Sequence, residues 1–309
     1  MSVTRVAAVD CGTHSLRLLV ADVDRQAGRS VDVARRLEIV RLGAGVDATG
    51  RLSDDALARS FAALDDYAAL VAALGAERVG VVATSATRDA ANRDTFTAGV
   101  TRRLGVAPTV LTGTAEAALS FAGATRDLPA GLATPRLVVD IGGGSTELVR
   151  GTTAVDQAWS VDMGCVRLSE RALRGDPPSP ASLAAAASMA ADAIASAARH
   201  VALHGAGTVV GVAGTVTTLA ALDARVARYD PGVTHHYRLG ADRARALTAQ
   251  LSAMDRAQRA ALPALHPGRV DVIVAGGLLL CAVLDATGAD AVVVSEHDLL
   301  DGLAWSLAC

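Results

Sequence analysis

The order of apolar and polar positions predicts two copies of the same strand–turn–strand unit. Residues 6–9 are apolar, residues 10–15 are rich in turn formers, and residues 16–23 are again largely apolar. The order returns at 137–149, where a second aspartate ends an apolar strand and opens a Gly/Ser/Thr turn. Each turn leads into another strand and not into a helix. The repetition predicts two lobes of similar construction, each beginning with a β-hairpin.

Further strands and helices alternate along the chain. We expect strands at 37–42, 79–83, 110–111, 159–162, 209–212 and 291–294, and helices at 54–74, 89–104, 116–124, 181–203, 241–259, 268–286 and 299–307. Ser53 is the expected N-cap of the first helix. Alternating strands and helices are typical of layered α/β folds. The Pro- and Gly-containing stretch 125–136 predicts a boundary between lobe I (1–124) and lobe II (125–309), with the last helix as a candidate to pack back on lobe I.

The turns are suited to binding phosphate. Successive backbone N–H groups of a turn form an anion site, glycine permits close approach, and hydroxyls add donors. The candidate phosphate-binding residues of the two turns are Gly12, Thr13, His14, Ser15, Gly142, Gly143, Gly144, Ser145 and Thr146. A third turn ends in Gly214 and Thr215 at a helix N-terminus, where an anion can bind, although a plain strand-to-helix connection has the same pattern. A dinucleotide-binding Rossmann turn is disfavoured because it would lead into a helix.

Composition removes several classes of function. All 29 basic residues are arginine, so a Walker P-loop and Schiff-base chemistry are excluded, and any fixed cation facing an anionic substrate is an arginine. The net charge of −3 gives no general basic field for nucleic acid. We expect no membrane span, since no stretch approaches roughly 18 consecutive apolar residues. The four cysteines lack metal-site spacing and indicate free thiols in the cytoplasm.

The motifs, taken in order, resemble the exopolyphosphatase/guanosine pentaphosphate phosphatase (Ppx/GppA) family over essentially the whole chain. The segments that carry the resemblance are 9–18, 83–92, 113–117, 140–148, 164–168 and 269–276. The resemblance implies an actin-like, sugar-kinase-like (ribonuclease H-like) α/β fold with an active-site cleft between the lobes. It also implies Mg²⁺ or another divalent cation, removal of a terminal phosphate by water, and a homodimer.

The resemblance also assigns roles to individual residues. Glu116 matches the family's catalytic glutamate, the general base for the attacking water, and Arg88 matches an arginine that binds phosphate. Taken alone, Glu116 also fits an ordinary first-turn glutamate that complements a helix dipole. Asp10, Asp140 and Glu147 are candidates to bind the metal or to orient water, without a choice among the three.

This sequence departs from the family pattern at two positions and in length. His14 stands where relatives more often have asparagine, and Ala115 stands where many have a second acidic residue. Longer relatives add a helical C-terminal region, and its absence here leads us to expect action on short rather than long polyphosphate. The remaining histidines are expected to be structural: His200 and His204 on a helix surface, 235–236 in a loop, and His297 in a helix cap.

Three alternatives to exopolyphosphatase activity remain open. Guanosine pentaphosphate (pppGpp) phosphatase activity uses the same chemistry, and the motifs do not separate the two. A small-molecule kinase of the same fold would transfer phosphate to an acceptor. A non-catalytic polyphosphate or nucleotide sensor would bind without turnover. We expect polyphosphate or pppGpp as the substrate and no nucleic-acid polymer as a partner.

Overall fold

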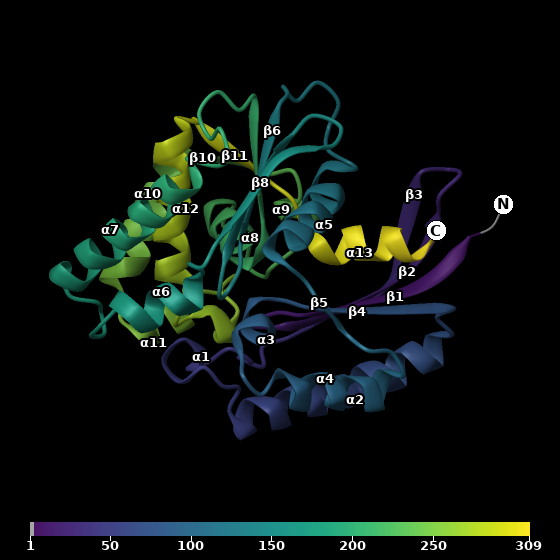
Figure 1. Cartoon of the computed structure of the whole chain (residues 1–309). Coiled ribbons are helices and arrows are strands. Elements are labelled where there is room, and N and C mark those ends of the chain that lie inside the picture. The colour runs from purple at the N-terminus through teal and green to yellow at the C-terminus, as the bar shows by residue number, and fades with distance from the viewer. Residues whose placement is uncertain (1–2) are drawn as a thin grey trace. The chain divides into compact units, whose positions relative to one another are not determined.

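The computed structural model describes residues 3–309, which divide into two compact units (Figure 1). The first unit contains residues up to Gly123 together with Leu299–Cys309, and the second contains Ala124–Asp298. The last helix therefore belongs to the first unit. No helix within residues 3–309 is long and apolar enough to cross a membrane.

The first unit is built on a five-stranded sheet with the strand order β3-β2-β1-β4-β5. Its strands are β1 (Thr4–Cys11), β2 (Leu16–Asp24), β3 (Arg29–Glu38), β4 (Arg78–Ala83) and β5 (Thr109–Val110). Its helices are α1 (Val46–Thr49), α2 (Asp54–Leu74), α3 (Ser85–Asp89), α4 (Arg93–Leu104), α5 (Gly113–Thr125) and α13 (Leu299–Leu307).

The two faces of this sheet carry separate cores because successive side chains of a strand point to opposite faces. Ala7 and Val9 of β1 pack with residues of α2 and α4, including Phe96. Val6 and Ala8 pack with α13, and Ala115 and Leu119 of α5 join that second core. Figure 1 shows α2 and α4 on one side of the strands and α13 on the other. Asp10 has the parity of Val6 and Ala8, so it projects from the face that carries α5 and α13.

The second unit is built on a six-stranded sheet with the order β10-β11-β9-β6-β7-β8. Its strands are β6 (Arg136–Ile141), β7 (Thr146–Gly151), β8 (Val155–Val161), β9 (Thr208–Val212), β10 (Arg238–Gly240) and β11 (Ala291–Val294). Its helices are α6 (Cys165–Ala172), α7 (Pro180–Ala197), α8 (Ala213–Asp223), α9 (Pro231–Thr234), α10 (Ala241–Ala253), α11 (Arg256–Ala260), the 3₁₀ turn η1 (Pro267–Arg269) and α12 (Ile273–Thr287).

One large core covers a single face of this second sheet. Leu137, Val139 and Leu148 pack there with helices α6, α7, α8, α10 and α12. Asp140 and Glu147 have the opposite parity, so both project from the other face of the sheet. The two acidic side chains leave the same pair of strands on the same side.

Many predicted elements are confirmed. The helix 54–74 has the expected bounds, and Ser53 Oγ accepts a hydrogen bond from the Ala56 N–H at 3.3 Å, as an N-cap does. Both hairpins are confirmed, with Asp10 opposite Arg17 and Asp140 opposite Glu147 in antiparallel register.

Other boundaries were wrong. The strand expected at 37–42 is β3, which ends at Glu38 and is mostly exposed, so its sequence lacks an apolar run. The helix expected at 181–203 ends at Ala197, so His200 and His204 do not lie on a helix. The helix expected at 241–259 is two helices, because Asp255 starts α11 with a capping box. The helix expected at 268–286 begins at Ile273, after a 3₁₀ turn.

Candidate active site

The two hairpin turns adopt the same backbone form. In the first, the Gly12 N–H donates to the Ser15 carbonyl at 3.0 Å. In the second, the Gly142 N–H donates to the Ser145 carbonyl at 3.1 Å. A Cβ added at either glycine would lie 3.0 or 3.1 Å from that same carbonyl, so the tight turn favours glycine. The sequence repeat therefore corresponds to a repeated local structure.

The first turn is held by side-chain and backbone contacts within the first unit. The Thr13 hydroxyl lies 2.8 Å from the Ser85 hydroxyl and accepts from the Ala86 N–H at 3.2 Å. The Thr13 carbonyl accepts from the Gly43 N–H, and the His14 carbonyl accepts from the Arg41 N–H, both at 2.8 Å. The predicted phosphate residue Thr13 therefore also joins the turn to the start of α3.

Asp10 is neutralised by a neighbour on the next strand. Its Oδ2 accepts from Arg17 Nε at 2.9 Å and from Arg17 Nη2 at 2.6 Å. The Asp10 side chain is only 5% exposed and that of Arg17 is 19% exposed, so the pair is shielded from water. A carboxylate paired in this way is a poor first choice for a divalent cation, because the arginine already balances its charge.

The second turn carries the opposite charge pattern at the equivalent position. Asp140 lies directly opposite Glu147 in the register of β6 and β7, where the first hairpin pairs Asp10 with Arg17. Both acids are buried, and Glu147 Oε1 accepts from the Ser160 hydroxyl at 2.7 Å. Like charges directly opposite each other on one sheet face are unfavourable. A divalent cation with oxygen ligands would relieve that repulsion, so this pair fits Mg²⁺.

The start of α6 supports the second turn from behind. The N–H of Cys165 donates to the Gly142 carbonyl, and the N–H of Val166 donates to the Gly143 carbonyl, both at 2.9 Å. A Cβ at Gly164 would overlap the Gly143 backbone, so only glycine permits this approach. In a trans peptide the carbonyl and the next N–H point in opposite directions. The N–H groups of Gly143 and Gly144 therefore point away from α6, as an anion site requires.

The third turn lies near the same part of the second unit. It has a cation beside it, Arg269, that the sequence pattern does not single out. A Cβ at Gly214 would overlap the Arg269 guanidinium, so this arginine lies directly against the N-terminus of α8. Burial raises the pKa of Cys165 to about 11, while Arg269 and a hydrogen bond with Thr215 act in the opposite direction. These contacts bring Cys165, Gly214, Thr215 and Arg269 together. The only sequence signal for Arg269 was its place at the head of the motif 269–276.

Glu116 and Arg88 lie close together within the first unit. Glu116 is in the first turn of α5 and is 8% exposed, and its Oε2 lies 3.4 Å from Arg88 Nη1. The same Arg88 nitrogen donates to the Leu111 carbonyl at 2.9 Å. Thr112 accepts from the Ala115 N–H at 3.2 Å and so caps the start of α5. Arg88 and Thr112 also line a pocket of about 450 Å³ that includes Arg93.

The helix that carries Glu116 is fixed by the end of the chain. A Cβ at Gly302 of α13 would overlap the Leu119 carbonyl of α5, so the two helices pack at backbone distance. Leu299, Leu303 and Trp305 anchor α13 in the core on that face of the sheet. The position of Glu116 therefore depends on residues far away in the sequence.

Comparisons of the sequence and of the structure with known proteins all identify the same family. The family model described as the Ppx/GppA phosphatase family matches residues 19–308. The chain is 48% identical to exopolyphosphatase 2 of Mycobacterium tuberculosis over 320 aligned positions, which cover 100% of both chains. A crystal structure of an exopolyphosphatase-like protein superposes with a TM-score of 0.93 at 40% identity and 98% coverage of each chain. The Aquifex aeolicus family member gives a TM-score of 0.83 at 30% identity, over 99% of this chain and 97% of that one.

Proposed function

Because the chain belongs to the Ppx/GppA phosphatase family, we propose that it hydrolyses the terminal phosphoanhydride bond of inorganic polyphosphate and releases orthophosphate. The observation that carries the proposal is the buried Glu116 beside Arg88 at the start of α5. A carboxylate and an arginine in contact supply a base for water and a clamp for the phosphate that water attacks. The predicted α/β fold, shared with solved members of the family, supports the same conclusion.

Glu116 acts as the general base in this mechanism. A base must lie within about 3 Å of the proton that it removes, directly or through one water, and contributes typically 10²–10⁴-fold to the rate. Its fixed place on the first turn of α5, capped by Thr112, holds the carboxylate in one position. Arg88 orients Glu116 and donates to the phosphoryl oxygens through a second edge of its planar guanidinium.

The turns hold phosphate oxygens through backbone N–H groups and hydroxyls. In the second turn, the carbonyls of Gly142 and Gly143 are bound by α6, which supports donation by the Gly143 and Gly144 N–H groups to an anion. Ser145 and Thr146 complete that turn. In the first turn, His14 and Ser15 have the same role, while Gly12 closes the turn through its own N–H. Arg269 adds a fixed positive charge at the third turn.

The divalent cation of the reaction is held by Asp140 and Glu147 in this proposal. Two buried acids in cross-strand register support that choice, and the ion pair of Asp10 with Arg17 argues against Asp10 as a ligand. Bound there, Mg²⁺ supplies electrostatic stabilisation of the charge that develops on the transferred and leaving phosphates. Asp10 instead keeps Arg17 in place beside the first turn.

A comparison of substrates tests the proposal. Phosphate release is measured with Mg²⁺ on short polyphosphate, long polyphosphate, pppGpp, and ATP with and without sugar acceptors. We expect the fastest release from short polyphosphate, with a product that carries one oxygen from solvent water. Preference for pppGpp would favour the nucleotide phosphatase, transfer to an acceptor would favour a kinase, and tight binding without release would favour a sensor. Each of those three results contradicts the proposal.

We also propose a cytoplasmic homodimer. Cys11, Cys165, Cys281 and Cys309 are all free thiols in the described chain, which agrees with a reducing compartment. Sedimentation of the purified chain measures the dimer directly, and a single species of monomer mass at micromolar concentration would contradict it.

A further inference from the structure

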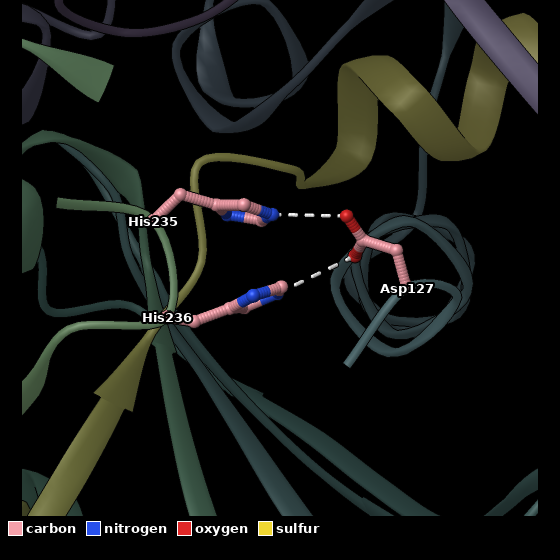
Figure 2. Close-up of side chains that lie close together, drawn as sticks. All are labelled: Asp127, His235 and His236. Carbon is pink, nitrogen blue, oxygen red and sulfur yellow. Dashed lines mark hydrogen bonds and ion pairs between the residues drawn. The ribbon is translucent and has the colours of Figure 1, made fainter. Parts of the chain in front are cut away.

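A cluster of imidazoles surrounds one carboxylate in the second unit, and the proposed hydrolysis uses none of these groups (Figure 2). Asp127 Oδ2 lies 2.9 Å from His235 Nε2 and 2.9 Å from His297 Nδ1. Asp127 Oδ1 lies 3.8 Å from His236 Nε2. The four residues come from three separate segments of the chain, so the cluster exists only in the folded protein.

The backbone is bent so that two neighbouring histidines face the same carboxylate. Side chains of successive residues in extended chain point to opposite sides. His236 instead has a φ of 62°, in the left-handed region, and its N–H donates to the Val294 carbonyl at 2.7 Å. As a result the rings of His235 and His236 lie side by side, with centroids 3.7 Å apart, and both point toward Asp127 (Figure 2).

The nitrogen of His236 that faces Asp127 lacks a hydrogen bond. Its Nε2 is buried and has no hydrogen-bond partner among the described residues, and the carboxylate at 3.8 Å is too far away to serve. Leaving such an atom without a partner costs on the order of a hydrogen bond. A neutral imidazole nitrogen in this position can offer its lone pair to a metal ion.

The donor set indicates which class of metal would bind. Asp127 supplies a carboxylate oxygen, and His235 and His236 supply imidazole nitrogens. Neutral imidazole nitrogen together with carboxylate oxygen is a donor set that suits zinc and its neighbours among the transition metals. Mg²⁺ and Ca²⁺ prefer oxygen ligands alone.

We propose that Asp127, His235 and His236 bind a divalent transition-metal ion of the zinc class. The three ligand atoms all lie within 4.8 Å of one another. Ligands of a tetrahedral zinc ion at about 2.0–2.1 Å lie roughly 3.4 Å apart. Asp127 Oδ2 lies 2.9 Å from His235 Nε2 and Asp127 Oδ1 lies 3.8 Å from His236 Nε2, so the separations from the carboxylate lie on either side of that value. His297 then orients the carboxylate from its outer side, as hydrogen-bonded partners of metal ligands commonly do.

The three ligands are not equivalent. The Glu296 N–H donates to His235 Nδ1 at 3.1 Å, which leaves the ring proton on Nε2, toward Asp127. A metal ion at Nε2 displaces that proton to Nδ1 and ends the hydrogen bond with Glu296. His235 is therefore the weaker ligand, and Asp127 and His236 contribute more to the affinity.

The place of the cluster along the chain gives the metal a structural effect. The chain enters the second unit at Ala124 and leaves it after Asp298, and Asp127 and His297 lie close to these two points. The contact between them closes the two ends of the unit on each other. His235 already contacts Asp127, and a metal ion would bind both histidines of that segment to the carboxylate. Binding therefore stabilises the folded second unit.

Zinc titration of the full chain after treatment with a chelator tests the proposal. Isothermal titration should give one Zn²⁺ per chain, and Co²⁺ should give the visible absorption of a nitrogen- and oxygen-ligated ion. Asp127→Asn and His236→Asn should each weaken Zn²⁺ binding at least about tenfold, and His235→Gln should weaken it less. Asparagine is chosen at position 236 because it tolerates the left-handed backbone.

The matched control is the double variant His200→Asn with His204→Asn, which removes two exposed histidines elsewhere in the same unit. It should bind Zn²⁺ like the parent, and Zn²⁺ should raise the melting temperature of both. Circular dichroism establishes that each variant is folded. The proposal is overturned if the parent binds no stoichiometric Zn²⁺, if Asp127→Asn and His236→Asn both bind like the parent, or if the control variant loses the site.

Discussion

The two hairpin turns share one backbone form but carry different charges. Each begins with a buried aspartate and closes with a glycine N–H bonded to a serine carbonyl. The residue opposite the aspartate is Arg17 in the first hairpin and Glu147 in the second. The register thus pairs the first aspartate with a basic residue and the second aspartate with an acidic one. In the proposed mechanism, the first turn holds phosphate and the second turn also holds the metal ion.

The largest expected effect of breaking this difference is on metal dependence. Asp140→Asn and Glu147→Gln should each lower kcat by about 10²–10³-fold, because the charge that holds Mg²⁺ near the leaving phosphate is reduced. Asp10→Asn should leave the Mg²⁺ concentration for half-maximal rate close to that of the parent. Phosphate release as a function of Mg²⁺ measures both. An equal rise in the Mg²⁺ concentration for half-maximal rate in all three variants would remove the distinction between the turns.

The second-largest expected effect is a loss of folding stability when the ion pair of the first turn is broken. Asp10→Asn leaves the shielded Arg17 without its carboxylate, which should cost about 3 kcal/mol, at the low end for a buried pair because Arg17 is partly exposed. The double variant Asp10→Asn with Arg17→Met removes both charges and should recover part of that loss. Urea unfolding measures the series. A single variant as stable as the parent would contradict the role given to this pair.

The glycines that pack against the two turns, Gly164 and Gly43, face atoms of different rigidity. We expect substitutions there to have a smaller effect than loss of the Asp10 carboxylate. A Cβ at Gly164 overlaps the backbone of Gly143, whereas a Cβ at Gly43 overlaps side-chain atoms of Thr13 and Ala86, which can shift more than a backbone can. Gly164→Ala should therefore cost about 1–3 kcal/mol of stability and raise KM for polyphosphate, and Gly43→Ala should change both less. Thermal unfolding and initial rates check the pair. The reverse order of the two variants would be inconsistent with α6 as the support of the second turn.

The smallest effect concerns pH and the thiol beside the second turn. The pKa of Cys165 is about 11 in the folded chain, against 9.0 as its ordinary value, because burial disfavours the thiolate. The folded state thus holds the proton more tightly, and stability falls as pH rises from 9 toward 11. Cys165 lowers the free energy of unfolding by about 1.4 kcal/mol at pH 10 relative to neutral pH. Urea unfolding at pH 8 and pH 10 should show this extra loss in the parent and not in Cys165→Ala.

The sequence predicted local elements well and long-range contacts poorly. The helix 54–74 was found because its apolar spacing and its cap at Ser53 are both local. The strand β3 was misplaced because it is an exposed edge strand without an apolar run. The break before α11 was missed because helical periodicity continues across Asp255, where the capping box starts a new helix.

The same limit applies to the candidate sites. The turns and Glu116 stand in contiguous motifs, so their residues can be predicted from the sequence. The contact of Arg269 with Gly214 joins segments that no local pattern connects. His235, His236 and His297 were expected to be structural, and only the fold brings them to Asp127. Their separation along the chain gave no metal-site spacing.

The most direct test of the account is the rate of phosphate release from short polyphosphate by Glu116→Gln, which keeps the shape of the side chain and removes the base. We expect kcat to fall by about 10²–10⁴-fold with little change in KM, because the lost interaction belongs to the transition state. The matched control Glu77→Gln changes an exposed glutamate of the same unit and should keep the rate of the parent. Turnover by Glu116→Gln close to that of the parent would contradict the proposed mechanism.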